Sequence, residues 1–368
     1  MLDESWSPQQ LEAIDKVQRW LDDPKGPQIF YLFGFAGTGK TTLAKYLAAT
    51  AGRVLYACYT GKAALVLRKK GCYGASTIHS LIYKAHQDSQ GRWHFSINYD
   101  SPLRLADLLV VDEVSMVGEE LGQDVCSFNR KILVLGDPGQ LPPIKGEGYF
   151  INSEPNVMLT EVHRQAQDNP IIRMSMDVRQ YRPLVEGVYG SSEVLSRDLL
   201  TDDMLLNADQ VLCGTNRNRA RLNHKIRELK GFEGRFHIDH PVEGDKLVCL
   251  RNKRDKGLLN GSLWQVQDVG CRRNNLVLSV MSLDEDNVTK VVEVPENFFL
   301  GTEDQLDWRT RMNFEEFTFG QALTVHKAQG SQWDNVTLFD DSAAFGDKHV
   351  QWMYTGLTRA AESIRVIT

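Results

Sequence analysis

No apolar stretch in this 368-residue chain approaches the roughly 20 residues that a membrane-spanning helix requires. The first ten residues, MLDESWSPQQ, are acidic and polar, unlike a signal peptide. Cysteine is scarce and scattered, with no CxxC pair, which argues against a disulfide framework or a zinc site. Reduced side chains in a cytosolic protein fit this pattern better. The six cysteines are Cys58, Cys72, Cys126, Cys213, Cys249 and Cys271.

The chain also lacks an excess of positive charge, since its formal net charge is -6 at pH 7. This balance argues against indiscriminate attraction to polyanions, although it leaves room for a local basic groove. Residues 215–256 hold twelve Lys or Arg against six Asp or Glu. That segment is either a local basic surface or an ordinary solvated helix face. Its first basic residues are Arg217, Arg219, Arg221, Lys225 and Arg227.

What the chain does contain is a phosphate-binding loop. The run GFAGTGKTT (34–42) fits GxxxxGK(S/T) and lies between a strand-like run and a helix-like run. The glycines let backbone N–H groups curve around phosphate oxygens, Lys40 reaches the β- and γ-phosphates, and Thr41 ligates Mg²⁺. An ordinary glycine-rich turn is the alternative, which the full match and its flanks disfavour. The sequence therefore predicts a site for a nucleoside triphosphate and Mg²⁺, formed by Gly34, Gly37, Thr38, Gly39, Lys40, Thr41 and Thr42.

Two later strand ends carry related chemistry. A buried-strand pattern at 106–111 ends in Asp112 and Glu113. Asp112 can hold the water shell of Mg²⁺, and Glu113 can polarise the attacking water, which favours hydrolysis over phosphoryl transfer. A second strand-like run at 132–135 leads into GDPGQLPPI, which contains Gln140. Its amide can hydrogen-bond the γ-phosphate or the attacking water.

The order of these motifs resembles that of superfamily 1 helicases of the 5′→3′ branch, specifically the RecD/Dda-like group. The resemblance runs nearly end to end, with one small departure: Gly356 stands where Ala is more usual in the family. It implies an ATP-dependent 5′→3′ DNA helicase or single-strand translocase. The segments that carry it are SPQQLEAI (7–14), GFAGTGKTT (34–42), YTGKAA (59–64), STIHS (76–80), VDEVSM (111–116), GDPGQLPPI (136–144), LTEVHRQ (159–165), ALTVHKAQGS (322–331) and YTGLTRA (354–360).

The resemblance also implies roles for individual residues. Gln10 would read the adenine, and Gly330 would join the nucleotide-binding residues. Arg164 and Arg359 would act as arginine fingers beside the catalytic Lys40, Glu113 and Gln140, because a guanidinium offers two contacts to phosphate oxygens. A surface salt bridge is the alternative for either arginine. The implied DNA contacts are Thr60, Lys62, Thr77, His79, Thr324, His326 and Lys327, with Trp93 and Phe95 on a hairpin.

The fold that follows is α/β, with two RecA-like doubly wound parallel-sheet domains at 1–165 and 166–368. Strand-like runs at 28–33, 53–58, 107–112 and 131–136 alternate with helical stretches, and a second set follows at 211–213, 321–325, 336–339 and 364–367. Alternating aromatics predict a β-hairpin near 84–101, which is the duplex-splitting pin in the resembled family or else a surface ornament. Strand periodicity at 235–316 predicts an insertion of short β-strands. The resemblance implies that this insertion is the SH3-like β-barrel accessory domain of the family.

The resemblance implies a monomeric, cytoplasmic motor of a bacterial or phage-infected cell, without a membrane. Its partners would be single-stranded DNA, single-strand/duplex junctions, and replication or recombination proteins. We expect no docking or nuclease domain, which disfavours a RecD-like ATPase subunit of a larger nuclease–helicase complex. The intact catalytic residues disfavour a non-catalytic binding module. A small-molecule kinase would need neither the ALTVHKAQGS motif nor two arginine fingers.

Overall fold

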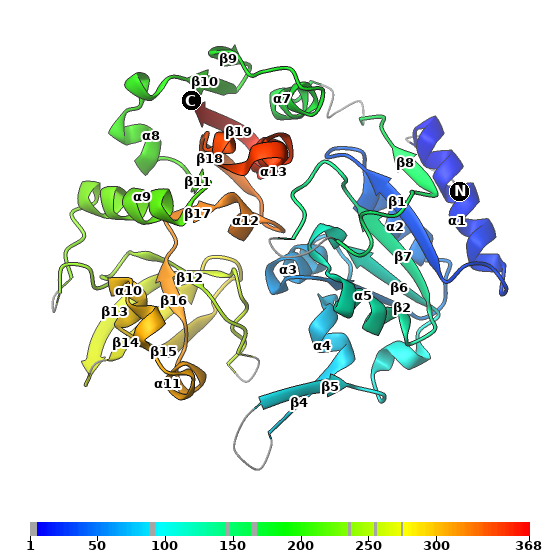
Figure 1. Ribbon diagram of the computed structural model, residues 1–368, viewed down its shortest axis with the longest axis horizontal. Helices are drawn as coiled ribbons and strands as arrows, with labels where there is room; N and C mark the ends of the chain where they lie inside the picture. The colour runs from blue at the N-terminus through cyan, green and yellow to red at the C-terminus, as the bar shows by residue number, and fades with distance from the viewer. Residues whose placement is uncertain are drawn as a thin grey trace. The chain divides into compact units, whose positions relative to one another are not determined.

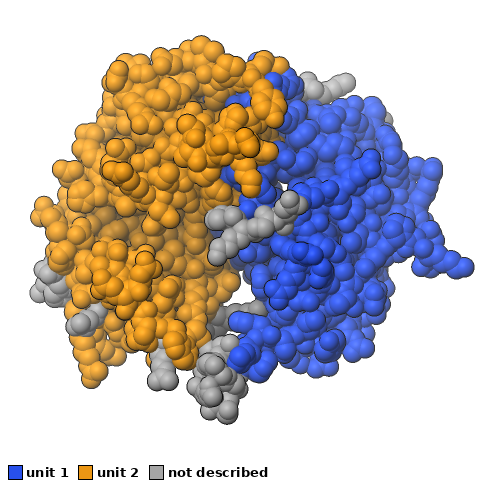
Figure 2. Space-filling view, viewed as in Figure 1, with its two compact units in different colours: residues 1–180 blue, residues 181–368 orange. Residues whose placement is uncertain are grey.

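The computed structural model describes residues 6–87, 93–143, 148–162, 168–234, 237–253, 256–273 and 275–368. The chain divides into two compact units, 1–180 and 181–368, which Figure 2 colours separately. The sequence prediction placed this boundary after residue 165. The first unit continues instead through helix α7 (Pro170–Arg179), where the Arg179 guanidinium carbon lies 3.3 Å from the ring centroid of Phe35.

The first unit is built on a six-stranded sheet in the order β3-β2-β6-β7-β1-β8, with every pair parallel (Figure 1). Parallel strands place their carboxyl ends at one edge of the sheet. The loops after the neighbouring strands β6, β7 and β1 therefore meet. The strands are β1 (Ile29–Gly34), β2 (Val54–Cys58), β3 (Ser76–Thr77), β6 (Leu108–Asp112), β7 (Lys131–Gly136) and β8 (Val157–Leu159).

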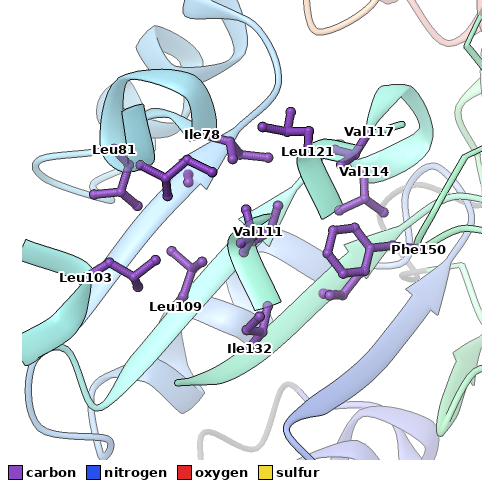
Figure 3. Close-up of a cluster of buried hydrophobic side chains, with 14 of the residues drawn as sticks. Ile78, Leu81, Leu103, Leu109, Val111, Val114, Val117, Leu121, Ile132 and Phe150 are labelled. Carbon is purple, nitrogen blue, oxygen red and sulfur yellow. The ribbon is translucent and has the colours of Figure 1, made fainter. Parts of the chain in front are cut away.

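Helices cover both faces of this sheet, and alternate strand residues point to opposite faces. Leu108 and Val110 pack in a core with α1 and α2, whereas Leu109 and Val111 pack with α4 and α5 (Figure 3). Two covered faces explain why these strands are apolar at successive positions. The helices are α1 (Pro8–Asp22), α2 (Lys40–Ala48), α3 (Gly61–Lys69), α4 (Ile78–Ile82) and α5 (Glu119–Cys126).

A β-hairpin leaves the first unit between α4 and the short 3-10 helix η1 (Pro102–Leu105). Strands β4 (Tyr83–Gln87) and β5 (Trp93–Ile97) pair antiparallel and extend away from the sheet (Figure 1). The alternation of aromatic residues therefore predicted the hairpin correctly.

The second unit contains another six-stranded sheet, in the order β17-β11-β18-β19-β10-β9. Its pairs are parallel except β9–β10. The strands are β9 (Gly187–Tyr189), β10 (Ser192–Leu195), β11 (Gln210–Cys213), β17 (Ala322–Thr324), β18 (Trp333–Phe339) and β19 (Ala360–Ile367). The accompanying helices are α8 (Asp202–Leu206), α9 (Asn216–Leu229), α12 (Val325–Ala328), α13 (His349–Leu357) and the 3-10 helix η5 (Ser342–Lys348).

Between α9 and β17 the chain forms a separate five-stranded antiparallel sheet, in the order β15-β14-β13-β12-β16. Its strands enclose their own apolar core, which includes Trp264 and Phe317. The fifth strand, β16, lies just beyond the predicted limit of residue 316. The strands are β12 (Lys246–Cys249), β13 (Leu263–Arg272), β14 (Asn275–Ser282), β15 (Thr289–Pro295) and β16 (Phe317–Phe319), with helices α10 (Asn297–Leu300) and α11 (Trp308–Asn313).

The predicted α/β architecture is confirmed, with a parallel sheet in the first unit and a mostly parallel sheet in the second. Every strand-like run identified in the sequence corresponds to an observed strand, whereas the short strands β3, β8, β9, β10 and β16 were not predicted. Among the described residues, no helix has both the length and the apolar composition needed to cross a bilayer.

Candidate nucleotide site and nucleic-acid interface

The loop from β1 to α2 has a backbone that only glycine accommodates at several positions. Gly37 and Gly39 have φ of 77° and 79°, in the left-handed region. A Cβ on Gly39 would lie 2.7 Å from Gln10 Nε2, and a Cβ on Gly34 would lie 2.7 Å from Thr38 Oγ1. Close neighbours therefore explain Gly34, the backbone conformation explains Gly37, and both explain Gly39.

Lys40 and Thr41 begin α2 and point their polar ends into this loop region. The Lys40 ammonium donates to the carbonyls of Gly34 (2.6 Å) and Phe35 (2.9 Å). The Thr41 hydroxyl donates to Asp112 Oδ2 at 3.1 Å, so the end of β6 lies beside the start of α2. Thr42, the next predicted contact, is exposed.

Asp112 and Glu113 form the acidic end of β6. Asp112 is only 9% exposed, and its Oδ1 accepts from the Glu113 N–H at 2.8 Å. Burial first, and then the Glu113 carboxylate, raise the pKa of Asp112 above its ordinary value. Glu113 has a φ of 55°, an uncommon conformation for a residue with a side chain. A cation bound here would favour the charged form of Asp112.

The oxygen donors at this position suit Mg²⁺. Hydroxyl and carboxylate oxygens are its preferred protein ligands, and it commonly takes only one or two of them together with phosphate and water. Thr41 and Asp112 provide one of each at hydrogen-bonding distance. Among the described residues, no group of three His, Cys, Asp or Glu could hold a metal ion by itself.

Gln140 follows β7, the strand between β6 and β1. Its side chain is 9% exposed, and its Oε1 is buried without a hydrogen-bond partner among the described residues. The turn before it is fixed because Gly139 N–H donates to Asp137 Oδ1 at 3.0 Å. A buried acceptor of this kind suits a water or a phosphate-bound proton.

Gln10 and Gln9 are both engaged with neighbouring backbone. Gln10 Nε2 donates to the Thr38 carbonyl (3.1 Å), and its Oε1 accepts from Ser7 N–H (3.0 Å). Gln10 thus supports the phosphate loop in this structure, and adenine reading stays a prediction. Gln9, which the sequence reasoning missed, accepts from the N–H groups of Thr160 (2.8 Å) and Glu161 (3.0 Å).

Of the two predicted arginine fingers, the structure describes only Arg359. Arg164 falls in 163–167, outside the described residues. Arg359 is 5% exposed and donates within the second unit, to Thr355 O (3.0 Å), Ser331 O (3.2 Å) and Thr358 Oγ1 (3.1 Å). Its role as a finger stays a prediction.

Three of the predicted DNA-contacting threonines share one structural position. Thr60, Thr77 and Thr324 are the N-cap residues of α3, α4 and α12, and each hydroxyl accepts from a backbone N–H three residues later. Thr77 and Thr324 end a strand, and Thr60 lies two residues after the end of β2. The repeated strand–Thr–helix unit therefore occurs at strand ends in both units, where the motifs predicted DNA contacts.

Comparison with known proteins agrees with these motifs. Residues 6–190 match the AAA domain family, and residues 319–367 match the UvrD-like helicase C-terminal domain. The chain belongs to the AAA domain family, and its two matches group it with the superfamily 1 proteins of the RecD and Pif1-like kind.

One relative is the ATP-dependent RecD2 DNA helicase of Deinococcus radiodurans, 29% identical over 371 aligned residues that cover 93% of this chain and 47% of the relative. The chain thus spans about half the length of that helicase. A structure of two coordinating Pif1 helicases at forked double-stranded DNA has a TM-score of 0.63 and 20% identity, covering 100% of this chain and 92% of that one. Bacteroides Pif1 bound to single-stranded DNA has a TM-score of 0.60 and 19% identity, covering 100% and 93%.

In the second unit, the ALTVHKAQGS segment is more buried than its predicted role suggests. Lys327 Nζ donates to Asn260 Oδ1 at 2.6 Å, and burial lowers the pKa of its ammonium. The His326 ring lies 5.5 Å from that of Phe345, and burial, followed by the Lys348 charge, lowers its pKa. Gly330, the penultimate residue of the segment, has φ of 75°. Asn260 is a partner that the sequence alone did not reveal.

The DNA-contact candidates of the first unit differ in exposure. His79 is exposed, and its ring centroid lies 5.8 Å from those of both Tyr59 and Tyr83. Lys62 is 7% exposed. On the hairpin, Phe95 is 68% exposed, whereas the Trp93 side chain lies outside the described part of the chain. These DNA contacts stay predictions.

Proposed function

We propose that this chain is an ATP-driven DNA helicase that moves 5′→3′ along single-stranded DNA and couples ATP hydrolysis to duplex unwinding. The observation that carries the proposal is the Thr41–Asp112 bond beside the glycine loop, with Glu113 directly next to it. These groups can hold a triphosphate and a water together, which hydrolysis requires.

The chain's own residues divide the work of hydrolysis. The loop N–H groups and Lys40 bind the phosphates, and Glu113 accepts a proton from the attacking water. Gln140 orients that water or senses the γ-phosphate. Thr41 and Asp112 would hold Mg²⁺, which offsets phosphate charge when bound. Arg164 and Arg359 would stabilise the charge that develops on the transferred phosphoryl group.

The DNA is proposed to run along the capped strand ends, with contacts from the predicted Thr, His and Lys residues. The exposed Phe95 supports the hairpin as a pin at the single-strand/duplex junction, since an exposed aromatic ring can stack on a base. The five-stranded antiparallel sheet is proposed to be the SH3-like accessory domain. A RecD-like subunit of a larger nuclease complex is the alternative, and gel filtration with nuclease assays on this chain would distinguish the two.

ATP hydrolysis with and without single-stranded DNA tests the proposal. We expect slow turnover alone and much faster turnover with DNA. Lys40→Ala should abolish turnover, and Glu113→Gln should keep ATP binding but lose turnover. Glu119→Gln is a matched control, because Glu119 is exposed on α5 and has no part in the site. A high rate of ATP hydrolysis that is unchanged by DNA and by Glu113→Gln would contradict the proposal.

A further inference from the structure

The β4–β5 hairpin projects from the first unit with little intrinsic support. In the described part of the chain its two strands pair only with each other, and residues 84–86 and 94–96 are exposed. A two-stranded hairpin is marginally stable in water by itself. A hairpin that acts on a duplex must therefore be held in a fixed orientation by contacts at its root, where its two strands join the first unit.

Backbone contacts hold both ends of the root. Asn98 N–H donates to Ile82 O, and Ser101 Oγ donates to Leu81 O, each at 2.7 Å. Leu81 of α4 and Leu103 of η1 are buried in the apolar core against the sheet (Figure 3). These contacts fix where the hairpin begins and ends, on α4 and η1.

Tyr83 provides a third attachment, to a different helix. It is the C-cap residue of α4 and the first residue of β4. Its hydroxyl donates to Asp124 Oδ2 of α5, and its ring lies 5.8 Å from that of His79. Both Tyr83 and Asp124 are half-buried. Attachments to α4, η1 and α5 together can resist rotation of the hairpin about its root. The two attachments at the ends of the hairpin, to α4 and η1, cannot do so alone.

We propose that Tyr83 is a positioning residue for strand separation, which holds the hairpin against α5 through its hydroxyl bond to Asp124. The inference rests on the proposed function, in which the hairpin acts as the pin. Tyr83 lies at the start of β4, at the root of the hairpin, so it acts on unwinding through the orientation of the hairpin.

The chemistry of the pair suits a permanent attachment. Burial first, and then the bond to Asp124 and its charge, raise the pKa of Tyr83 above its ordinary value. The phenol therefore stays protonated and remains a donor at any working pH. A hydrogen bond to a carboxylate is also stronger than one between neutral groups.

Tyr83→Phe tests the attachment because it removes only the hydroxyl and keeps the ring against His79. In the full chain, we expect the rate of duplex unwinding to fall about tenfold. This factor corresponds to the lower end of the free-energy range for loss of one hydrogen bond to a charged group. Single-strand-stimulated ATP hydrolysis should stay unchanged, so fewer base pairs are separated per ATP. Asp124→Asn keeps an acceptor oxygen and should retain unwinding, whereas Asp124→Leu should behave like Tyr83→Phe.

Tyr149→Phe is the matched control, since the Tyr149 ring packs against Gly122 of the same helix α5. It should leave the ratio of base pairs to ATP unchanged. The inference is overturned if Tyr83→Phe keeps the original ratio, or if it loses ATP hydrolysis and thermal stability along with unwinding.

Phe95→Ala separates this inference from the proposed function. Reduced unwinding by Phe95→Ala with normal unwinding by Tyr83→Phe would overturn the attachment and leave the pin standing. Normal unwinding by Phe95→Ala would overturn the pin itself, and the role of Tyr83 with it.

Discussion

Replacing Gly39 with Ala perturbs the phosphate loop in two ways. Gly39 has φ of 79°, and a left-handed backbone costs a residue with a side chain about 1–2 kcal/mol. The added Cβ would also lie 2.7 Å from Gln10 Nε2, which would displace that amide from the Thr38 carbonyl. Loss of this hydrogen bond costs about 1 kcal/mol. The two effects together amount to about 2–3 kcal/mol.

If ATP binding requires the native loop, the binding free energy of ATP becomes less favourable by this amount. Titration of a fluorescent ATP analogue should then show roughly 30- to 150-fold weaker binding by Gly39→Ala. Gly74→Ala is the matched control, because Gly74 has φ of 75° but no atom within 4 Å of its added Cβ. It precedes β3, the strand at the edge of the sheet opposite to β8, so it should lower stability and leave ATP affinity unchanged.

Two results would refute this reasoning. Gly39→Ala could bind ATP as tightly as the unchanged chain, which would show that the loop tolerates the clash. Gly74→Ala could weaken ATP binding to the same degree, which would show that the loss reflects general strain rather than the loop.

Two further variants test other contacts of the structure. Arg227→Met should lower the free energy of unfolding in urea by about 3–5 kcal/mol, because it leaves Asp245 buried without its partner, whose Nε lies 3.1 and 3.2 Å from the two carboxylate oxygens. The exposed Arg221→Met on the same helix should change it by about 0.5 kcal/mol or less, and equal losses would contradict the assignment. Gln10→Ala should weaken ATP and GTP binding alike in nucleotide titrations, since its amide supports the loop. Selective loss of ATP affinity would show instead that Gln10 reads adenine.

The nucleotide site could be predicted from the sequence because its residues lie close in sequence to strands that their apolar pattern identifies. Each group lies at the end of a buried strand or within a few residues of it, and parallel pairing then brings the strand ends to one edge. The Thr41–Asp112 bond confirms this expectation across 71 residues of sequence. The helix start at Thr60, Thr77 and Thr324 also had a local signal, since Thr is a preferred N-cap residue.

Contacts between segments that are not neighbours in the sequence could not be predicted in this way. The Lys327–Asn260 and Arg227–Asp245 bonds depend on how the antiparallel sheet packs on its neighbours, which no local pattern encodes. The basic run at 215–256 was ambiguous for the same reason. Arg227 proves to be buried in an ion pair, while Arg217 and Arg221 are exposed.

Strand displacement with two matched duplexes tests the central claim most directly. One duplex carries a 5′ single-stranded overhang and the other a 3′ overhang of the same sequence composition, and each is incubated with the chain and ATP. We expect release of the displaced strand only from the 5′-overhang duplex, and no release with Glu113→Gln. Release from the 3′-overhang duplex alone would contradict the direction of movement, and release that persists without ATP hydrolysis would contradict the motor itself.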